Sequence, residues 1–536
     1  MANAGIGRMF QRKSVGQIQS EHEHGELKRT LGPLNLILLG IGCIIGTGIF
    51  VLTGRAAAQF AGPAIMISFI ITGTLCALVA LCYAELASAL PVSGSAYSYT
   101  YASMGEGAAW VMGLLLILEY GLAASTVAVG WSGYFTSLLA DMHILIPPSL
   151  TAAPGVAVKD ATGAVIATGV MNLPAIVIIG LVTLLLVRGV SESATVNNVI
   201  VAIKLTVVIA FIVIGSRYVD TAHWSPLVPA QIPAPPPGTA MDIWHQIGRA
   251  LVAVVTGDNS TKYGVGGVIH GAAVIFFAYL GFEAVSTAGA ESRNPAKDMP
   301  IGILGALIIC TVLYIMTSAV LVGIVPYNLL DVPAPIALAA NMMGLTWFAV
   351  LVKIGAIAGL SSVMLVLLYG QTRIFYTMSR DGLLPPVLAS VHKTFQTPWI
   401  NTLIVGAAAM CAAGFLSLDA LSDLSNVGSL AAFALVCITV IYLRRSNPNL
   451  VRPFRTPLFP IVPVLGAAMC LVLLLSLMAT VATRNFFLIY LVVGIAIYFV
   501  YGIRNSKLGR GVLVTGGEGE PRELPHRVGD DPAGQG

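Results

Sequence analysis

Long uncharged apolar stretches recur along the chain and are separated by short polar breaks. A helix that spans a bilayer needs about 20 mostly apolar residues, and we expect twelve such spans. They are Pro33–Ala58, Pro63–Ala87, Gly107–Leu139, Met171–Val187, Ala194–Ser216, Gly264–Ala290, Met299–Val325, Leu345–Gln371, Pro398–Leu416, Leu421–Leu443, Pro457–Ala479 and Phe486–Ile503. Only 10% of the 536 residues are charged, too few to cover a soluble protein of this length. The sequence therefore predicts an all-α polytopic membrane protein and excludes a cytosolic enzyme, a nucleic-acid binder and a disordered scaffold.

The positions of Lys and Arg predict the orientation of the chain. If the N-terminus is cytoplasmic, 20 of the 28 basic residues lie in inside segments, six lie outside, and Lys204 and Lys353 lie within spans. Cytoplasmic loops are enriched in basic residues, so we expect both termini in the cytoplasm and the chain in the inner (plasma) membrane of the cell. The N-tail lacks the short apolar core and cleavage site of a secretory signal.

Glycines interrupt the first predicted span. Gly40, Gly42, Gly46 and Gly48 lie within nine residues, and each weakens a helix by about 1 kcal/mol relative to Ala. A glycine pair in a membrane helix more often permits close packing, but four glycines around Thr47 favour an unwound segment. Unwound backbone is tolerated in a membrane only where it contacts protein or a cavity.

The sixth predicted span offers a counterpart in its segment 276–283, which combines aromatic residues with Gly281 and Glu283. Alone, this pattern also fits an ordinary core helix. However, the two breaks open the first and the sixth of the first ten spans, as expected for two five-helix repeats of opposite topology. Interrupted helices in corresponding positions indicate a transporter site.

The free backbone groups at such breaks suggest the ligand. N–H groups near Thr47 and Gly48 present the positive end of a helix dipole to an anion. Free carbonyls near Ile44 and at the second break suit a cation. Donors and acceptors side by side favour a zwitterion such as the backbone of an amino acid.

Lys204 lies in the middle of the fifth span with about ten apolar residues on each side. An ionisable residue at this depth costs at least about 2.5–3.5 kcal/mol and is a candidate for function. A lysine in apolar surroundings can gain and lose a proton near neutral pH, which would couple proton movement to conformation. The structural alternative is that the side chain reaches an interface.

Other polar residues within the spans remain candidates. Glu119 and Glu283 could pair with a basic group, face a water path or select a cationic side chain, whereas Glu85 and Lys353 suit gates or helix interfaces. Ser361 could hold a cation or bond to its own helix. All seven Cys lie in apolar runs without a CxxC or Cys–His spacing, so we expect no metal site.

Several motifs together resemble the amino acid–polyamine–organocation superfamily, and most of all its cationic amino acid transporter branch. They are Gly40-Ile41-Gly42 with Gly46-Thr47-Gly48-Ile49-Phe50, residues 276–287 and 291–300, Tyr369-Gly370-Gln371-Thr372-Arg373, residues 379–385, and Arg452-Pro453-Phe454-Arg455-Thr456-Pro457.

The resemblance implies the LeuT-type 5+5 inverted repeat with helices 1 and 6 broken, plus two extra helices. The corresponding segments are an N-tail (1–32), two five-helix repeats (33–216 and 264–444) joined by an outside loop (217–263), helices 11 and 12 (445–504) and a disordered C-tail (505–536).

The resemblance also implies an L-amino acid substrate, the lipid bilayer as surroundings and the proton, not sodium, as coupling ion, without a cofactor. Lys204 would face the first helix near Gly42. The remaining implied site residues are Thr47 and Gly48 for the carboxylate, the carbonyls of Ile44, Phe277 and Leu280 for the amino group, Gly46 and Ala278 beside them, and Glu119, Ser361 and Met364 at the side-chain end.

The sequence leaves alternatives open. The chain could be a proton-coupled symporter, an exchanger or facilitator in which Lys204 is structural, or, from a different class, a membrane amino-acid sensor. It does not decide between small neutral and cationic amino acids, and it identifies no protein partner. A membrane enzyme would need a nucleophile–base pair, HExxH or carboxylate cluster, and the sequence has none.

Overall fold

The chain is helical along most of its length. A computed structural model describes residues 9–13, 30–92, 94–159, 165–189, 194–232, 246, 253 and 262–511. The other parts of the predicted tails and of the 217–263 loop lie outside the described residues. The longer helices are α5 (Ile65–Ala89), α6 (Ser95–Met104), α7 (Glu106–Asp141), α8 (Leu173–Arg188), α9 (Ala194–Gly215), α11 (Gly264–Ile275), α12 (Pro295–Ile324), α13 (Pro335–Met342), α14 (Thr346–Arg380), α15 (Trp399–Phe415), α16 (Leu418–Ser446), α17 (Ile461–Met478) and α18 (Val481–Ile497), with α3 (Pro33–Ile44) before them.

Short elements connect these helices. They are η1 (Gly48–Leu52), α4 (Thr53–Ala56), η2 (Ala57–Ala61), η3 (Gly62–Ala64), η4 (Pro148–Leu150), η5 (Ser216–Tyr218), η6 (Thr221–Trp224), η7 (Phe276–Tyr279), η8 (Glu283–Glu291), η9 (Tyr327–Leu329), η10 (Pro386–Ala389), η11 (Tyr498–Gly502) and α19 (Ile503–Asn505). Strands β1 (Ala157–Lys159) and β2 (Val165–Thr168) form an antiparallel hairpin in the loop between α7 and α8. This hairpin was not predicted from the sequence.

Nine apolar helical stretches in the described part of the chain are long enough to cross a membrane, and α3, α8 and α15 are shorter apolar helices. Together they overlap all twelve predicted spans. The first span is divided, and its second part continues as one helical stretch, Gly48–Ala89, into the second span. The chain is thus a helical polytopic membrane protein, while twelve membrane crossings remain a prediction.

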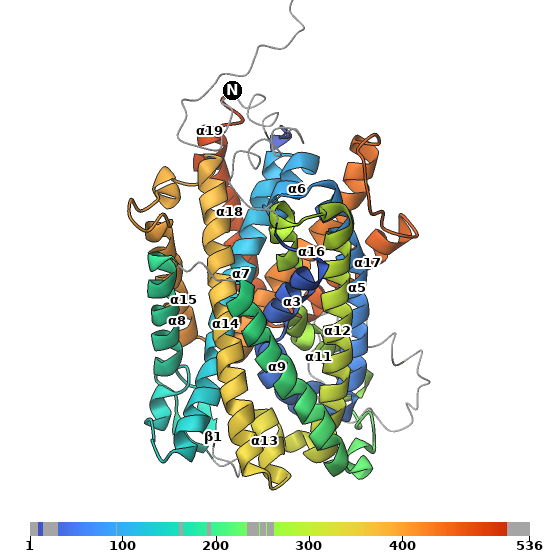
Figure 1. Cartoon of the computed structure of the whole chain (residues 1–536), viewed down its shortest axis with the longest axis vertical. Helices are drawn as coiled ribbons and strands as arrows, with labels where there is room; N and C mark the ends of the chain where they lie inside the picture. The colour runs from blue at the N-terminus through green and yellow to red at the C-terminus, as the bar shows by residue number, and fades with distance from the viewer. Residues whose placement is uncertain are drawn as a thin grey trace, which may run out of the picture.

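The helices form an elongated bundle (Figure 1). α7 packs against α14 and α16 in its middle, α8 packs on α15 at one edge, and α5 packs on α12 and α17 at the other. α3 lies inside the bundle and contacts α12 and α9. Outward-facing apolar side chains cover the edges, for example Leu184 of α8 and Val492 of α18, which are 59% and 66% exposed. In a membrane these side chains contact lipid.

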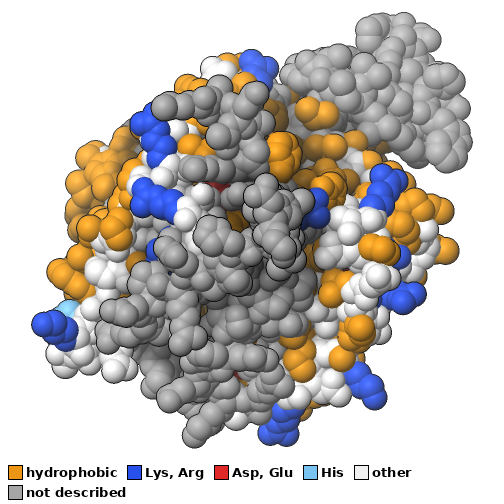
Figure 2. Space-filling model, turned by 90° about the horizontal axis from the view of Figure 1, so that it is seen from above, with side chains coloured by type: hydrophobic (Ala, Val, Ile, Leu, Met, Phe, Trp, Pro, Cys, Tyr) orange, Lys and Arg blue, Asp and Glu red, His pale blue; other side chains and the backbone are white. Residues whose placement is uncertain are grey.

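The two ends of the bundle differ. α6, α19 and the described N-terminal residues lie at one end, and α13 and β1 lie at the other (Figure 1). The end with α6 carries basic side chains around its rim (Figure 2). At this end Lys13 forms a buried ion pair with Asp381 at 2.7 Å, and Ser506 hydrogen-bonds to Glu106. Parts of both predicted tails therefore pack against the helices.

Glu85 is the centre of a buried ionic cluster between α5 and α16. Arg444 donates two hydrogen bonds to its carboxylate, at 2.8 and 2.5 Å, and the backbone N–H of Thr456 donates a third at 2.8 Å. Arg452 lies 3.5 Å from the same carboxylate and donates to carbonyls at the end of α16. This cluster gives the segment 452–457 a structural role: it ties the loop before α17 to α5.

We expect the Glu85→Ala variant to lose stability. Removing one partner of a buried ion pair leaves uncompensated charge and costs about 3–5 kcal/mol. Thermal unfolding of the purified protein in detergent should show a clear drop in apparent Tm. A matched variant at the exposed Lys297 should unfold like the wild type. Equal Tm values for Glu85→Ala and Lys297→Ala would contradict a stabilising role of the cluster.

Candidate functional site

The first helix is broken where the glycines predict it. α3 ends at Ile44, Ile45 and Gly46 are not helical, and helical structure resumes around Thr47 and Gly48. The backbone hydrogen bonds among the described residues include none donated by the N–H groups of Gly46, Thr47 or Gly48. These N–H groups lie at the start of a helical stretch, where they have no acceptor within the helix. They form the positive end of its dipole.

The sixth predicted span is broken as well. α11 ends at Ile275, η7 makes one turn of 3-10 helix, and Leu280 is extended with ψ 136°. Gly281 then adopts φ +113°, a conformation that residues with a side chain rarely adopt. η8 begins at Glu283, whose carboxylate accepts the N–H of Gly281 at 2.8 Å.

The two breaks cross each other in close contact. A Cβ atom on Gly48 would lie 2.1 Å from the Cα of Ala278, and a Cβ on Gly281 would lie 2.7 Å from the Cβ of Cys43. Each break therefore has a glycine where the other segment passes. The close approach explains why these positions lack side chains, which the sequence alone did not reveal.

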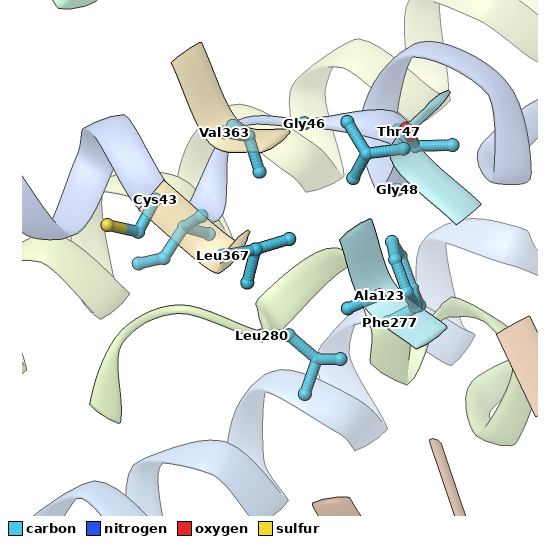
Figure 3. A pocket seen from close by; sticks show the side chains of 11 residues that line it. Cys43, Gly46, Thr47, Gly48, Ala123, Phe277, Leu280, Val363 and Leu367 are labelled. Atoms are coloured by element: carbon cyan, nitrogen blue, oxygen red, sulfur yellow. The ribbon is translucent and has the colours of Figure 1, made fainter. Parts of the chain in front are cut away.

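A small buried cavity lies beside this crossing (Figure 3). The first break, the second break, α7 and α14 all contribute to its wall. The lining residues are Cys43, Ile44, Gly46, Thr47, Gly48, Phe277, Leu280, Ala123, Val127, Val363 and Leu367.

The structure brings six of the predicted substrate-binding residues to this cavity and places the others around it. Ile44, Gly46, Thr47, Gly48, Phe277 and Leu280 line the wall. Ala278 contacts Gly48 instead. Ser361 and Met364 lie on α14 but are not among the lining residues. The Ser361 hydroxyl accepts a hydrogen bond from Trp131 at 2.9 Å and donates one to the carbonyl of Ile357 in its own helix at 2.8 Å. Ser361 therefore bonds to its own helix, one of the two alternatives that the sequence left open.

Backbone and side-chain groups at the cavity could bind opposite charges. The hydroxyl of Thr47 is buried without a hydrogen-bond partner among the described residues. On the acceptor side, the carbonyl of Ile44 receives the hydroxyl of Tyr314 at 2.8 Å, and that of Phe277 receives the N–H of Leu280 at 3.3 Å. A carbonyl oxygen has two lone pairs, so both can accept a further donor.

Tyr314 is a functional candidate that was not predicted from the sequence. It lies on α12, is fully buried and donates to the last residue of α3. A tyrosine in an apolar span gives no pattern that points to a distant carbonyl. Three further lining residues were not predicted from the sequence: Ala123, Val127 and Leu367. Only the packing of α7 and α14 places them at the cavity.

Lys204 contacts the broken helix on the side of α9. Its Nζ donates to the carbonyl of Gly42 at 2.7 Å, and its side chain is fully buried. The methylene stem packs on α14, because a Cβ on Gly359 would lie 3.0 Å from the Cγ of Lys204. The lysine therefore joins three elements, α9, α3 and α14.

Two buried carboxylates lie on the other side of the breaks. Glu283 receives the hydroxyl of Tyr120 from α7 at 3.4 Å in addition to the N–H of Gly281. Glu119 is 1% exposed and precedes the lining residue Ala123 by one helical turn. Neither carboxylate is part of the cavity wall.

Ion pairs connect the broken helix and the N-tail to other elements at the two ends of the bundle. Arg55 lies in α4, after the first break. It is 2.8 Å from Asp419 of α16 and 3.4 Å from Asp331. At the end with α6, Lys13 pairs with Asp381, which also receives the hydroxyl of Tyr97 at 2.8 Å.

Comparison with known proteins identifies the family. Residues 31–500 match the family model described as amino acid permease. The chain belongs to the amino acid permease family. Members of this family are transporters and not enzymes, and an amino acid is the substrate that the family implies.

Curated relatives agree with this family and differ in what their names say they transport. The chain is 44% identical to the methylthioribose transporter of Bacillus subtilis and 43% identical to its branched-chain amino acid permease BcaP, over 94% of this chain and 100% of either relative. It is 34% identical to the vacuolar cationic amino acid transporter 4 of Arabidopsis thaliana, over 82% of this chain and 67% of the relative.

We expect the crossing to tolerate Gly46→Ala better than Gly48→Ala. A Cβ on Gly46 would lie 3.5 Å from Val363, an ordinary contact, whereas on Gly48 it would collide with the backbone of Ala278. Forcing a methyl group into packed surroundings costs about 1–3 kcal/mol. Thermal unfolding in detergent should therefore show a lower Tm for Gly48→Ala. If both variants unfold at the same temperature, the two breaks do not cross as described.

Proposed function

We propose that the permease is a secondary active transporter of L-amino acids that works by alternating access. The observation that carries this proposal is the buried crossing of two broken helices, which exposes unpaired N–H groups beside accessible carbonyls. An amino acid has a carboxylate for the first set and an ammonium group for the second. We assign the carboxylate to the N–H groups of Thr47 and Gly48, and the ammonium to the carbonyls of Ile44, Phe277 and Leu280.

The proposal includes the topology that the sequence and the breaks suggest. Twelve helices would form two inverted five-helix repeats of the LeuT type followed by two further helices. The end with α6 and both termini would be cytoplasmic, in keeping with its basic rim and the distribution of Lys and Arg. The pairs Arg55–Asp419 and Lys13–Asp381 would open in turn, one on each side of the membrane.

The substrate we propose has an uncharged, apolar side chain. The cavity wall beyond the two breaks consists of Ala123, Val127, Val363 and Leu367. A cationic side chain placed there would be desolvated without a carboxylate on the wall. The similarity to a branched-chain amino acid permease supports this choice. A second relative is named as a methylthioribose transporter. Methylthioribose has neither an ammonium nor a carboxylate group, so it could not pair with both the free N–H groups and the carbonyls at the breaks.

We propose that Lys204 couples transport to protons. As an ammonium ion it makes a charge-assisted bond to the carbonyl of Gly42, and such bonds are roughly twice as strong as neutral ones. Loss of the proton would weaken its hold on α3, the inner half of the broken helix. The protonation state of Lys204 would thus bias the position of a segment that also binds the substrate. In the competing proposal, an exchanger, the same bond only fixes α3.

Uptake into proteoliposomes separates these two proposals. An inward proton gradient should drive accumulation of substrate by the wild type and not by Lys204→Ala. Lys353→Ala is the matched control, because Lys353 is also within a span but pairs with Asp141 at 2.6 Å, and this variant should still accumulate substrate. Wild-type uptake that ignores the gradient would contradict symport. Accumulation by Lys204→Ala would contradict the coupling role.

A competition panel tests the proposed substrate class. Leucine, isoleucine, valine and alanine should compete for uptake or binding, while lysine and arginine should compete about ten-fold or more weakly, because their charge would be buried without a partner. Methylthioribose should not compete. Strong competition by arginine would contradict the apolar side-chain site, and strong competition by methylthioribose alone would contradict amino acid transport.

A further inference from the structure

The outward face of α14 carries an alternating ladder of tyrosines and arginines. Tyr369, Arg373, Tyr376 and Arg380 are spaced by four, three and four residues, so they lie on one face of the helix. The guanidinium of Arg373 lies 4.8 Å from the ring centroid of Tyr369, and that of Arg380 lies 5.8 Å from that of Tyr376. These cation–π contacts hold both guanidinium groups in place along the helix surface.

The exposed aromatic residues of α14 indicate the depth of this ladder in the membrane. Trp347, near one end of the helix, is 61% exposed, and Tyr369 is 45% exposed. At 1.5 Å per residue they lie about 33 Å apart, close to the roughly 30 Å of a bilayer's hydrocarbon core. Trp and Tyr concentrate at the two interfaces of a membrane. Arg373, one turn beyond Tyr369, therefore lies at the level of the lipid headgroups.

Arg373 has no ion-pair partner in the part of the chain that the structure describes, and it is exposed. An arginine fork matches a phosphate group and can bind it with two hydrogen bonds. Charge, depth and orientation thus fit one occupant, which is the headgroup of an anionic phospholipid.

We propose that Arg373, held on the ring of Tyr369, binds an anionic phospholipid of the adjacent leaflet. α14 also supplies Val363 and Leu367 to the cavity, and Leu367 lies less than two turns from Arg373. Bound lipid would therefore contact a helix that also lines the cavity. This inference goes beyond the proposed function, because lipid binding is measured without any amino acid.

Native mass spectrometry of the purified full-length protein tests the proposal, with phosphatidylglycerol and phosphatidylcholine as probes. The wild type should bind phosphatidylglycerol more tightly than phosphatidylcholine. Arg373→Gln should lower phosphatidylglycerol affinity about five-fold, the usual effect of one basic residue near an anionic surface. The phosphatidylglycerol affinity of Arg373→Lys should lie between those of the wild type and Arg373→Gln, because lysine keeps the charge but lacks the planar guanidinium fork. The control is Arg445→Gln on α16, which removes an exposed charge near the same end of the molecule and should bind like the wild type.

Three results would overturn the proposal. The first is unchanged phosphatidylglycerol binding by Arg373→Gln, and the second is an equal loss in Arg445→Gln, which would mean that any surface charge serves. The third is equal binding of the two lipids by the wild type. Thermal unfolding in lipid-free detergent should give the same Tm for Arg373→Gln and the wild type, so that a loss of affinity reports the ladder and not the fold.

Discussion

Backbone N–H and C=O groups inside a membrane need partners, and this requirement shapes the centre of the permease. Two helices are broken within the bundle, and side chains pair with several of the backbone groups at or near the breaks. These pairs are Lys204 with Gly42, Tyr314 with Ile44, Asn426 with Ala273 and Val274, and Glu283 with Gly281. The N–H groups of Gly46, Thr47 and Gly48 have no such pair among the described residues. The cavity lies where the pairing is incomplete, which is why we place the ligand there.

The few charges within the spans fall into different roles. Glu85 and Lys353 form ion pairs near the ends of the bundle and hold helices together. Lys204 differs, because it donates to a backbone carbonyl of α3, the helix that ends at the first break. In the proposed mechanism, a change in its protonation alters how firmly α3 is held. This difference is the reason for assigning coupling to Lys204 and structure to Lys353.

The sequence predicts the parts of this site that depend on local backbone chemistry. Long apolar runs locate the helices, and four glycines locate the first break, because helix propensity and hydrophobicity act within one segment. The second break was predicted from its corresponding position in the sixth span. Contacts between distant segments are different. Tyr314 and Leu367 carry no sequence signal, and Ser361, which suggested a binding hydroxyl, is used by Trp131 and its own helix. Only the packing of α7, α12 and α14 decides which side chains reach the cavity.

The central claim is that the two breaks bind an amino acid through backbone groups, and a structure of the permease with bound L-leucine tests it most directly. We expect the carboxylate within hydrogen-bond distance of the N–H groups of Thr47 and Gly48, the ammonium at the carbonyls of Ile44, Phe277 and Leu280, and the side chain towards Val363. A ligand bound outside this cavity, or with its carboxylate held by a basic side chain in place of these N–H groups, would contradict it.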